Sequence, residues 1–340
     1  MKTSVIDIGL QRSNPELVQA ISVAFAQSQP ELAPTFIVST TGSIGVVKRV
    51  QISTSALANS VKLSNAALGA KSGDIWSLLL STQHIAGLNV LARSVLLGTQ
   101  VVGVEKRADY SAIVPTQLHK ALTGDNELLS HLQNCKAVLV GGAALTNELL
   151  EKAISNGIKV VTTYGMTETC GGCVYDSVPL DGVSIAITNE GLIKISGPIL
   201  ASGYENDEEL WNQSFNNGWF TTNDLGNSKD GKLFISGRAD DVIITGGENV
   251  SLFAIESQLS SAFPEVNFLA TSIPDPQWGA KLCLISDKAI DHNKISEVLL
   301  LNLGRAAVPK EFLELTQIPQ IGIGKPDRVK AAALFIDKQR

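Results

Sequence analysis

Short apolar runs that end in polar, glycine-rich loops recur along the first half of the chain, and helical patterns follow them. Two such runs are Phe36–Val38 and Ala137–Val140. Strands that alternate with helices in this way predict an α/β fold, with a mostly parallel sheet covered by helices. Because ligands of such sheets bind beyond the carboxyl ends of the strands, four polar loops are expected to line one crevice: residues 39–48, 81–87, 141–143 and 164–172.

The pattern changes after residue 174 to short strands and turns, for example Ser184–Thr188, which predicts a small β-subdomain. Further on, a helical pattern over Phe253–Phe263 precedes two strand-like runs and a second helix. We therefore expect a large domain of helix-covered, mostly parallel sheets plus the β-subdomain over residues 1–238. A small α+β domain is expected over residues 239–340.

Composition excludes several classes of protein. The 340 residues suffice for two domains, and the net charge of −6 argues against nonspecific binding to nucleic acid. No apolar run reaches the ~18–20 residues needed to span a bilayer, so no integral membrane segment is expected. The first residues carry Asp7 where a signal peptide has its apolar core, which predicts a cytoplasmic location.

The loop after the first buried strand has the composition of a phosphate-binding loop. Residues 39–48 are rich in hydroxyls and glycine and end in Lys48, so they offer N–H groups, hydroxyl donors and a cation. The spacing of a Walker A loop is absent, and a simple turn is the alternative interpretation. The run Val50–Leu68 that follows is interpreted as a helix.

Two side chains near the second polar loop are candidates for substrate contact. Arg93 lies in an otherwise apolar helical run, where a cation is costly unless it is paired or reaches water. It could bind a substrate carboxylate or form an ion pair with a protein acid. His84 precedes the same run, and a structural histidine is the alternative there.

Two other features have competing interpretations. Cys170 and Cys173 have the spacing of half a zinc site or a redox pair, but no second pair accompanies them, so small side chains in a tight loop are the simpler explanation. The stretch Gly237–Val250 follows an Asp-Gly hairpin signal and contains two adjacent glycines. It is interpreted either as a surface hairpin between subdomains or as a hinge beside an active site.

Five motifs in order resemble the adenylate-forming superfamily of acyl-CoA synthetases, luciferases and peptide-synthetase adenylation domains. The resemblance covers residues ~38–330, and several ordered motifs are stronger evidence than one. The motifs are Thr40–Lys48, Tyr164–Glu168, Gly218–Asp224, Gly237–Asp240 and a glycine loop that ends in Lys325.

The resemblance implies binding of ATP with Mg²⁺ by a defined set of residues. The ATP phosphates would be held by the loop residues Thr40, Thr41, Gly42, Ser43, Gly45 and Lys48. Adenine would lie against Gly141, Gly142, Ala143 and Tyr164, with Gly165 and Met166 beside it. Thr167 would contact the α-phosphate, Glu168 would bind Mg²⁺, and the ribose hydroxyls would be held by Asp224 and Arg238. The catalytic residues would be Lys48, Thr167, Glu168 and Lys325.

The resemblance also implies two half-reactions in one site. Asp240 would be a hinge about which the small, mobile domain turns. This rotation would remove Lys325 from the active site and bring in a CoA-binding segment: Gly246, Gly247, Glu248 and Asn249. Three further features narrow the resemblance: the run Gln83–Leu88, Arg93 and the stretch Thr163–Asp176. With these residues the chain is most similar, within the superfamily, to the o-succinylbenzoate–CoA ligase family of menaquinone biosynthesis, in its short actinobacterial form. The resemblance implies small-molecule substrates. The acid would then be contacted by His84, Gly87, Arg93 and Gly165.

The chain also departs from the family pattern. Val47 replaces a proline, Ile44 a hydroxyl residue and Asn223 a glycine. Because the chain starts close to the phosphate loop, we expect much of the usual N-terminal subdomain to be missing or replaced. Alternatives are therefore a CoA ligase for another aryl or short acyl acid, an adenylation module that loads a carrier protein, and a nucleotide-binding member without turnover. A homodimer is possible.

Overall fold

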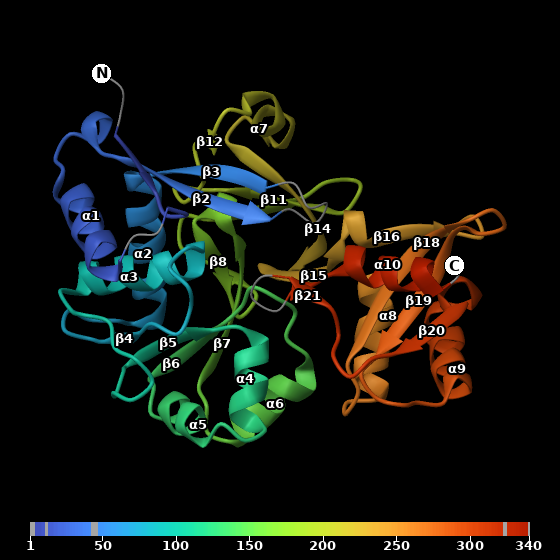
Figure 1. Cartoon of the computed structure of the whole chain (residues 1–340). Coiled ribbons are helices and arrows are strands. Elements are labelled where there is room, and N and C mark those ends of the chain that lie inside the picture. The colour runs from blue at the N-terminus through green and yellow to red at the C-terminus, as the bar shows by residue number, and fades with distance from the viewer. Residues whose placement is uncertain (1–3, 11–12, 42–46, 322–324, 339–340) are drawn as a thin grey trace. The chain divides into compact units, whose positions relative to one another are not determined.

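A computed structural model describes residues 4–10, 13–41, 47–321 and 325–338 (Figure 1). Contacts divide the chain into two compact units. The large unit comprises residues 1–145, 149–222 and 228–234, and the small unit comprises residues 146–148, 223–227 and 235–340. Among the described helices, none is long and apolar enough to cross a membrane. The domain boundary at residue 238 and the hinge at Asp240 stay predictions.

A six-stranded sheet in the order β4-β5-β6-β7-β8-β9 forms the centre of the large unit. The first four strands are parallel, as the strand–helix alternation predicted, and the last two are antiparallel. The strands are β4 (Trp76–Ser77), β5 (Tyr110–Ile113), β6 (Ala137–Val140), β7 (Val160–Met166), β8 (Gly171–Tyr175) and β9 (Val178–Pro179).

Helices cover this sheet on both sides because its strands are apolar on both faces. Leu118, Leu132 and Ala153 join one buried cluster with Val138 of β6. These side chains come from α4 (Pro115–Leu122), α5 (Asn126–Gln133) and α6 (Asn147–Ser155). A second cluster contains Leu57 of α2 (Thr54–Leu68) and Leu91 of α3 (Ile85–Leu97). Figure 1 shows α4 and α5 beside β5 and β6.

A second sheet in the large unit has the order β1-β2-β3-β12. It consists of β1 (Val5–Asp7), β2 (Thr35–Thr41), β3 (Val47–Ser53) and β12 (Gly203–Tyr204), with α1 (Asn14–Ala26) packed near it. The helix expected from Val50 is therefore wrong at its start. Val50 and Ile52 face the core at alternating positions of a strand, and α2 begins only after Ser53, whose Oγ accepts a hydrogen bond from the Ala56 N–H (3.1 Å).

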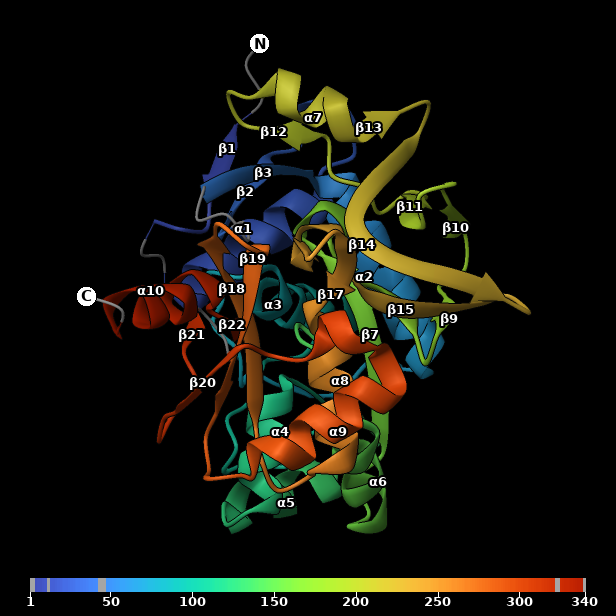
Figure 2. The same ribbon diagram turned by 90° about the vertical axis from the view of Figure 1, so that its right-hand side faces the viewer.

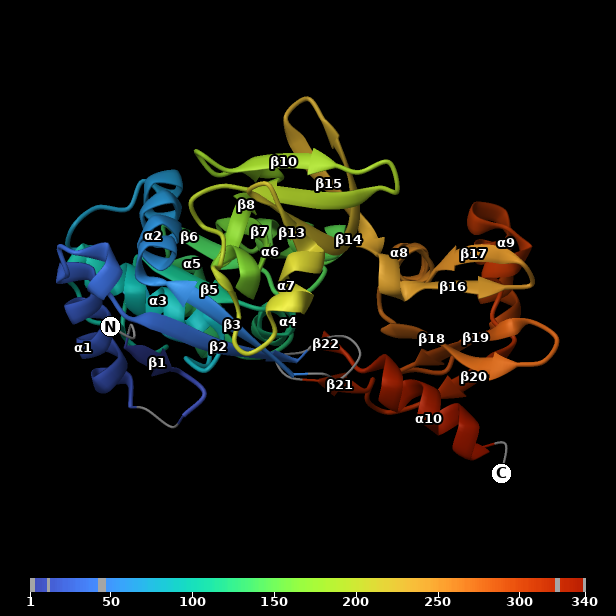
Figure 3. The same ribbon diagram turned by 90° about the horizontal axis from the view of Figure 1, so that it is seen from above.

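A third, antiparallel sheet forms the β-subdomain, in the order β10-β11-β14-β13, with β15 paired to β14. Residues Asp230 and Gly231 connect the last two strands, with φ of 51° and 73°, as expected of a two-residue hairpin turn. Figure 3 shows β10 and β15 in this layer. The elements are β10 (Ser184–Ile187), β11 (Leu192–Ser196), α7 (Glu208–Ser214), β13 (Phe215–Asn216), β14 (Trp219–Lys229) and β15 (Lys232–Arg238).

The small unit is an α+β fold, as predicted. Its sheet has the order β17-β16-β19-β18, with β20 paired to β19. Buried Ile255, Leu259, Ile295 and Leu299 come from two helices that lie side by side over this sheet, α8 and α9 (Figure 2). The elements are β16 (Val242–Thr245), β17 (Glu248–Ser251), α8 (Leu252–Ala262), β18 (Phe268–Asp275), β19 (Gly279–Ser286), α9 (His292–Leu303), β20 (Glu311–Glu314), β21 (Gln320–Ile321), β22 (Lys325–Pro326) and α10 (Arg328–Lys338).

Candidate active site

The turn between β7 and β8 carries the most constrained part of the site. β7 extends to Met166, and residues 167–169 form a short 3-10 helix before β8. A Cβ on Gly165 would lie 2.0 Å from the Gly171 carbonyl oxygen, so only glycine lets these strands approach. The Thr169 hydroxyl accepts from the Met166 N–H (2.9 Å) and donates to the Gly171 carbonyl (2.8 Å). The polar loop expected at residues 164–172 is thus an ordered strand end and turn.

This turn presents Glu168 to a tyrosine and a lysine from the neighbouring sheet. The Tyr204 hydroxyl donates to Glu168 Oε1 (2.8 Å), and Lys48 Nζ lies 3.4 Å from the same hydroxyl and 5.0 Å from the centre of the Tyr204 ring. Glu168 and Thr167 are each 8% exposed. The structure therefore brings together Lys48 and Glu168, two residues that the motifs predicted for phosphate and Mg²⁺.

Tyr204 is a functional candidate that the sequence analysis missed. Its burial raises the pKa of the phenol, and the adjacent Glu168 carboxylate raises it further, so Tyr204 stays protonated and acts as a hydrogen-bond donor. It lies on β12, which pairs with β3 and so places the ring beside Lys48. No charge pattern or catalytic motif marks Tyr204, and only the preceding Gly203 hints at a tight local approach.

The end of β6 offers bare backbone next to β7. A Cβ on Gly141 would lie 2.1 Å from the Thr163 hydroxyl oxygen, and Gly142 has a φ of 82°. Since β6 and β7 are parallel neighbours, these glycines and Ala143 follow β6 at the sheet edge where Tyr164 lies on β7. Ligands of open α/β sheets bind beyond the carboxyl ends of the strands, so these residues lie where a ligand is expected, and their contact with adenine stays a prediction.

Helix α3 contacts the same turn from its other side. The Asn89 amide donates to the Cys170 carbonyl (2.7 Å), and Gly87 is required because a Cβ there would lie 2.2 Å from the Ser81 carbonyl oxygen. His84 is the residue that precedes α3. Cys170 and Cys173 are free, buried thiols, and burial raises the pKa of Cys173 to about 12.

Arg93 is fully packed inside the large unit. Its guanidinium carbon lies 4.8 Å from the centre of the Trp76 ring, and one terminal nitrogen donates to the Tyr175 hydroxyl (3.3 Å). Only 3% of the residue is exposed, and its Nε has no hydrogen-bond partner. Burial lowers the pKa of this guanidinium. In the part of the chain that the structure describes, no carboxylate forms an ion pair with Arg93.

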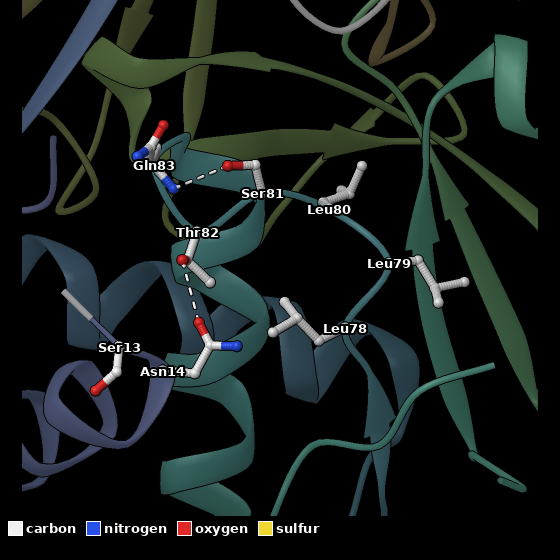
Figure 4. Close-up of a pocket in the computed structure, with 8 residues that line it drawn as sticks. All are labelled: Ser13, Asn14, Leu78, Leu79, Leu80, Ser81, Thr82 and Gln83. Atoms are coloured by element: carbon white, nitrogen blue, oxygen red, sulfur yellow. Dashed lines mark hydrogen bonds between the residues drawn. The ribbon is translucent and has the colours of Figure 1, made fainter. Parts of the chain in front are cut away.

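A pocket opens beside the polar loop that begins at Ser81 (Figure 4). Its wall combines Leu78–Leu80 and Ser81–Gln83 with the start of α1, where the Thr82 hydroxyl donates to Asn14 Oδ1 (3.3 Å). Among the described residues that line it, neither His84 nor Arg93 is present. The proposed contacts of these two residues with the acid stay predictions.

The small unit carries a separate cluster of predicted site residues. Arg238 binds Asp240 through two nitrogens (2.8 and 2.9 Å) and Asp224 through a third (2.8 Å). Burial alone would lower the pKa of Arg238, but these carboxylates raise it. Gly246 and Gly247, with φ of 59° and 84°, form the turn of the β16–β17 hairpin. The predicted CoA-binding residues Glu248 and Asn249 are therefore the first residues of β17.

The remaining predicted site residues lie at strand ends or outside the described residues. Gly42, Ser43, Ile44 and Gly45 lie outside the described residues. Thr40 and Thr41 end β2, opposite Lys48 and Val47 of β3. Lys325 is placed through its backbone, which pairs with Ile321.

The comparisons identify the class of protein. A family model described as AMP-binding enzyme matches residues 8–204. The chain therefore belongs to the AMP-binding enzyme family. It is 35% identical over 328 residues to a probable 2-succinylbenzoate–CoA ligase of Mycobacterium tuberculosis, which covers 88% of this chain and 84% of the relative.

Other relatives have a similar description. A 2-succinylbenzoate–CoA ligase of Listeria monocytogenes is 28% identical over 292 residues, or 77% of this chain and 62% of the relative. The AMP complex of o-succinylbenzoate coenzyme A synthetase (MenE) from Bacillus subtilis superposes with a TM-score of 0.76 at 27% identity, covering 87% of this chain and 68% of that chain. ATP-bound MatB from Rhodopseudomonas palustris shares the fold, with a TM-score of 0.81 at 23% identity. The match covers 92% of this chain and 70% of that chain.

Proposed function

We propose that this chain joins o-succinylbenzoate to CoA in an ATP-dependent, AMP-forming reaction through an acyl-adenylate. The observation that carries the proposal is the similarity over 88% of the chain to a relative that is named for this ligation. The contact between Glu168, Tyr204 and Lys48 supports it, because it gives the large unit an acidic and a basic group at one strand end.

In the first half-reaction a carboxylate oxygen of the acid attacks the α-phosphorus of ATP, and the bond to pyrophosphate breaks. Negative charge grows on the phosphoryl oxygens, so cations and hydrogen-bond donors are needed rather than a nucleophilic side chain. Lys48, Thr167 and Lys325 supply these groups. Glu168 suits Mg²⁺, because carboxylate oxygens are ligands of this hard cation and the Tyr204 hydroxyl fixes the orientation of the Glu168 carboxyl group. When bound, Mg²⁺ would neutralise phosphate charge.

In the second half-reaction the CoA thiol attacks the acyl carbonyl, and AMP leaves as the carbon–oxygen bond breaks. The predicted change at Asp240 would withdraw Lys325 and present the β16–β17 hairpin. We propose that Asp224 and Arg238 contact the ribose, and that Arg93 faces the aromatic carboxylate of the acid. That carboxylate needs a stationary partner, because only the succinyl carboxylate is activated.

Pyrophosphate release from purified protein, with ATP and Mg²⁺ and with or without o-succinylbenzoate, tests the proposal. We expect release that requires this acid, and a CoA thioester that forms only when CoA is added. Release with benzoates or short fatty acids instead would keep the chemistry and replace the substrate. A carrier protein as the preferred thiol acceptor would indicate a loading module, and ATP binding without release would indicate a member that has lost turnover. A cytoplasmic location and a homodimer stay predictions.

A further inference from the structure

A single arginine at the start of α10 binds two carboxylates from distant parts of the small unit. Arg328 Nε and one terminal nitrogen donate to the two oxygens of Asp241 (2.9 and 3.2 Å). Its terminal nitrogens also donate to both oxygens of Glu256 on α8, and one of them to the Ala270 carbonyl of β18 (2.7 Å). Arg328 is only 18% exposed at its side chain. We call Arg328, Asp241 and Glu256 the clamp.

Three further hydrogen bonds fix the backbone at the start of α10, next to the clamp. The Thr271 hydroxyl of β18 donates to the Arg328 carbonyl (3.1 Å). The Asp327 N–H donates to the Pro319 carbonyl (3.0 Å), and Asp327 Oδ1 accepts from the Lys330 N–H (2.9 Å). Lys325 therefore lies three residues before an anchored helix start, on the short ladder of β21 and β22.

The other end of the clamp lies at the predicted hinge. Asp241 follows Asp240 directly in a short 3-10 helix, and Asp240 is held by Arg238. A planar guanidinium that forms bidentate hydrogen bonds with two carboxylates fixes both the distance and the orientation of each carboxylate. The segment that carries Lys325 and the segment that carries Asp240 are thus joined through one side chain.

We propose that Arg328 is a positioning residue for the first half-reaction. It connects the segment that carries Lys325 to the segment that carries Asp240, and so fixes the position of the lysine within the small unit. The inference rests on the proposed function, in which Lys325 serves adenylate formation and not thioester formation. Loss of the clamp should therefore slow one half-reaction selectively. A residue that only stabilises the fold would affect both to the same extent.

The half-reactions can be measured separately in Arg328→Met and Arg328→Lys. Lysine keeps the charge but lacks the planar fork, so it cannot form both contacts. We expect adenylate formation in a single turnover to fall roughly ten- to hundredfold in both variants, the size of loss that a misplaced catalytic group produces. Thioester formation from synthetic acyl-adenylate and CoA should stay within about twofold of the wild-type rate.

Lys281→Met is the matched control. Lys281 also joins two carboxylates in the small unit, Asp275 (2.9 Å) and Glu311 (3.2 Å), but neither adjoins the hinge or the Lys325 segment. Both half-reactions should be preserved in this variant. If Arg328→Met does not fold, Arg328→Lys and Asp241→Asn carry the test. Equal losses in the two half-reactions, or no loss in folded variants, would overturn the inference.

Hydrogen exchange tests the clamp without catalysis. The amides of Asp327 and Lys330 should exchange at least about tenfold faster in Arg328→Lys than in wild type or in Lys281→Met, because their hydrogen bonds lie beside the clamp. Unchanged exchange at both amides would also overturn the inference. A wild-type protein that releases no pyrophosphate would instead contradict the proposed function, and the exchange result would still report on the clamp.

Discussion

Arg93 and Arg328 both have largely buried side chains, but their charged groups have different partners. Arg328 binds Asp241 and Glu256, and these carboxylates raise its pKa even though burial alone would lower it. Arg93 contacts the Trp76 ring and the Tyr175 hydroxyl, and burial lowers its pKa. One arginine is neutralised by the protein, and the other has no carboxylate partner among the described residues.

The difference indicates two roles for a buried cation. A guanidinium that is saturated by carboxylates has little left for a ligand, so Arg328 acts on the fold of its own unit. A guanidinium held by a neutral hydroxyl and an aromatic face, with Nε unpartnered, is costly for the protein to maintain. A carboxylate that arrives with the substrate would offset that cost, which is the role predicted for Arg93.

The largest expected effect is on stability. Arg328→Met leaves two acids of the small unit without their cation, and breaking a buried ion pair in this way costs about 3–5 kcal/mol of unfolding free energy. Arg93→Met removes a desolvated cation and leaves no described carboxylate without its ion-pair partner. The decrease in unfolding free energy should therefore be clearly smaller in this variant. Urea unfolding of both variants measures the difference. A larger loss in Arg93→Met would mean that Arg93 is the more important structural residue.

The next prediction concerns substrate binding. Arg93→Leu should raise the KM for o-succinylbenzoate by roughly ten- to hundredfold, because hydrogen bonds to charged groups contribute about 1.5–3 kcal/mol. The KM for ATP should change far less. Tyr175→Phe is the matched control, since it removes the hydroxyl partner and leaves the guanidinium. Equal increases in both KM values would contradict the assignment of Arg93 to the acid.

The two arginines should also differ in pH dependence. Burial raises the pKa of Glu256 despite the neighbouring Arg328, while the Ala270 N–H lowers it and Asp241 raises it further. Removing the cation should raise this pKa more. A folded-state pKa above the unfolded value of about 4.3 means that protonation favours the folded chain as the pH falls.

The stability deficit of Arg328→Met should therefore shrink as the pH is lowered from about 7 to about 5, whereas that of Arg93→Met should stay nearly constant. Urea unfolding at each pH value measures both deficits, with Lys281→Met as an additional reference. A constant deficit in Arg328→Met would show that Glu256 does not titrate in this range.

Local patterns predicted the elements whose partners are close in sequence. β6 was predicted with its observed bounds, and the Asp230–Gly231 turn was identified from its dipeptide. The start of α2 was wrong because Val50 and Ile52 fit a helical run as well as a strand, and only pairing with β2 decides between them. Periodicity alone does not separate short buried strands from helix segments.

The motifs named candidate site residues, and the roles of these residues stay predictions. Glu168 and Lys48 were singled out by resemblance, but the residue that joins them was not, because Tyr204 lies 36 positions from Glu168 and 156 from Lys48. The clamp was missed for the same reason, since Arg328 lies 87 positions from Asp241. Contacts of this kind depend on how distant elements pack or pair, which a single sequence does not reveal.

Glu168 is a third buried polar side chain, and like Arg93 it is hydrogen-bonded to a tyrosine hydroxyl. Tyr204→Phe removes this hydrogen bond but keeps the ring beneath Lys48. Its effect should therefore be smaller than those predicted for the variants at Arg328 and Arg93. A typical hydrogen bond contributes about 1 kcal/mol, which corresponds to a roughly fivefold increase in the Mg²⁺ concentration needed for half-maximal pyrophosphate release. Calorimetric titration of ATP at several Mg²⁺ concentrations gives a second, activity-independent readout.

Tyr110→Phe is the matched control for this change. The Tyr110 hydroxyl donates to the Leu68 carbonyl (3.2 Å), within the same unit but away from Lys48 and Glu168. That variant should keep the wild-type Mg²⁺ requirement while losing a similar hydrogen bond. If both variants shift the requirement equally, the effect is one of stability, and Tyr204 does not orient Glu168. If only Tyr204→Phe shifts it, the Tyr204 hydroxyl orients Glu168 for a cation, and the Tyr175 hydroxyl would have the corresponding role in the predicted binding of an anion by Arg93.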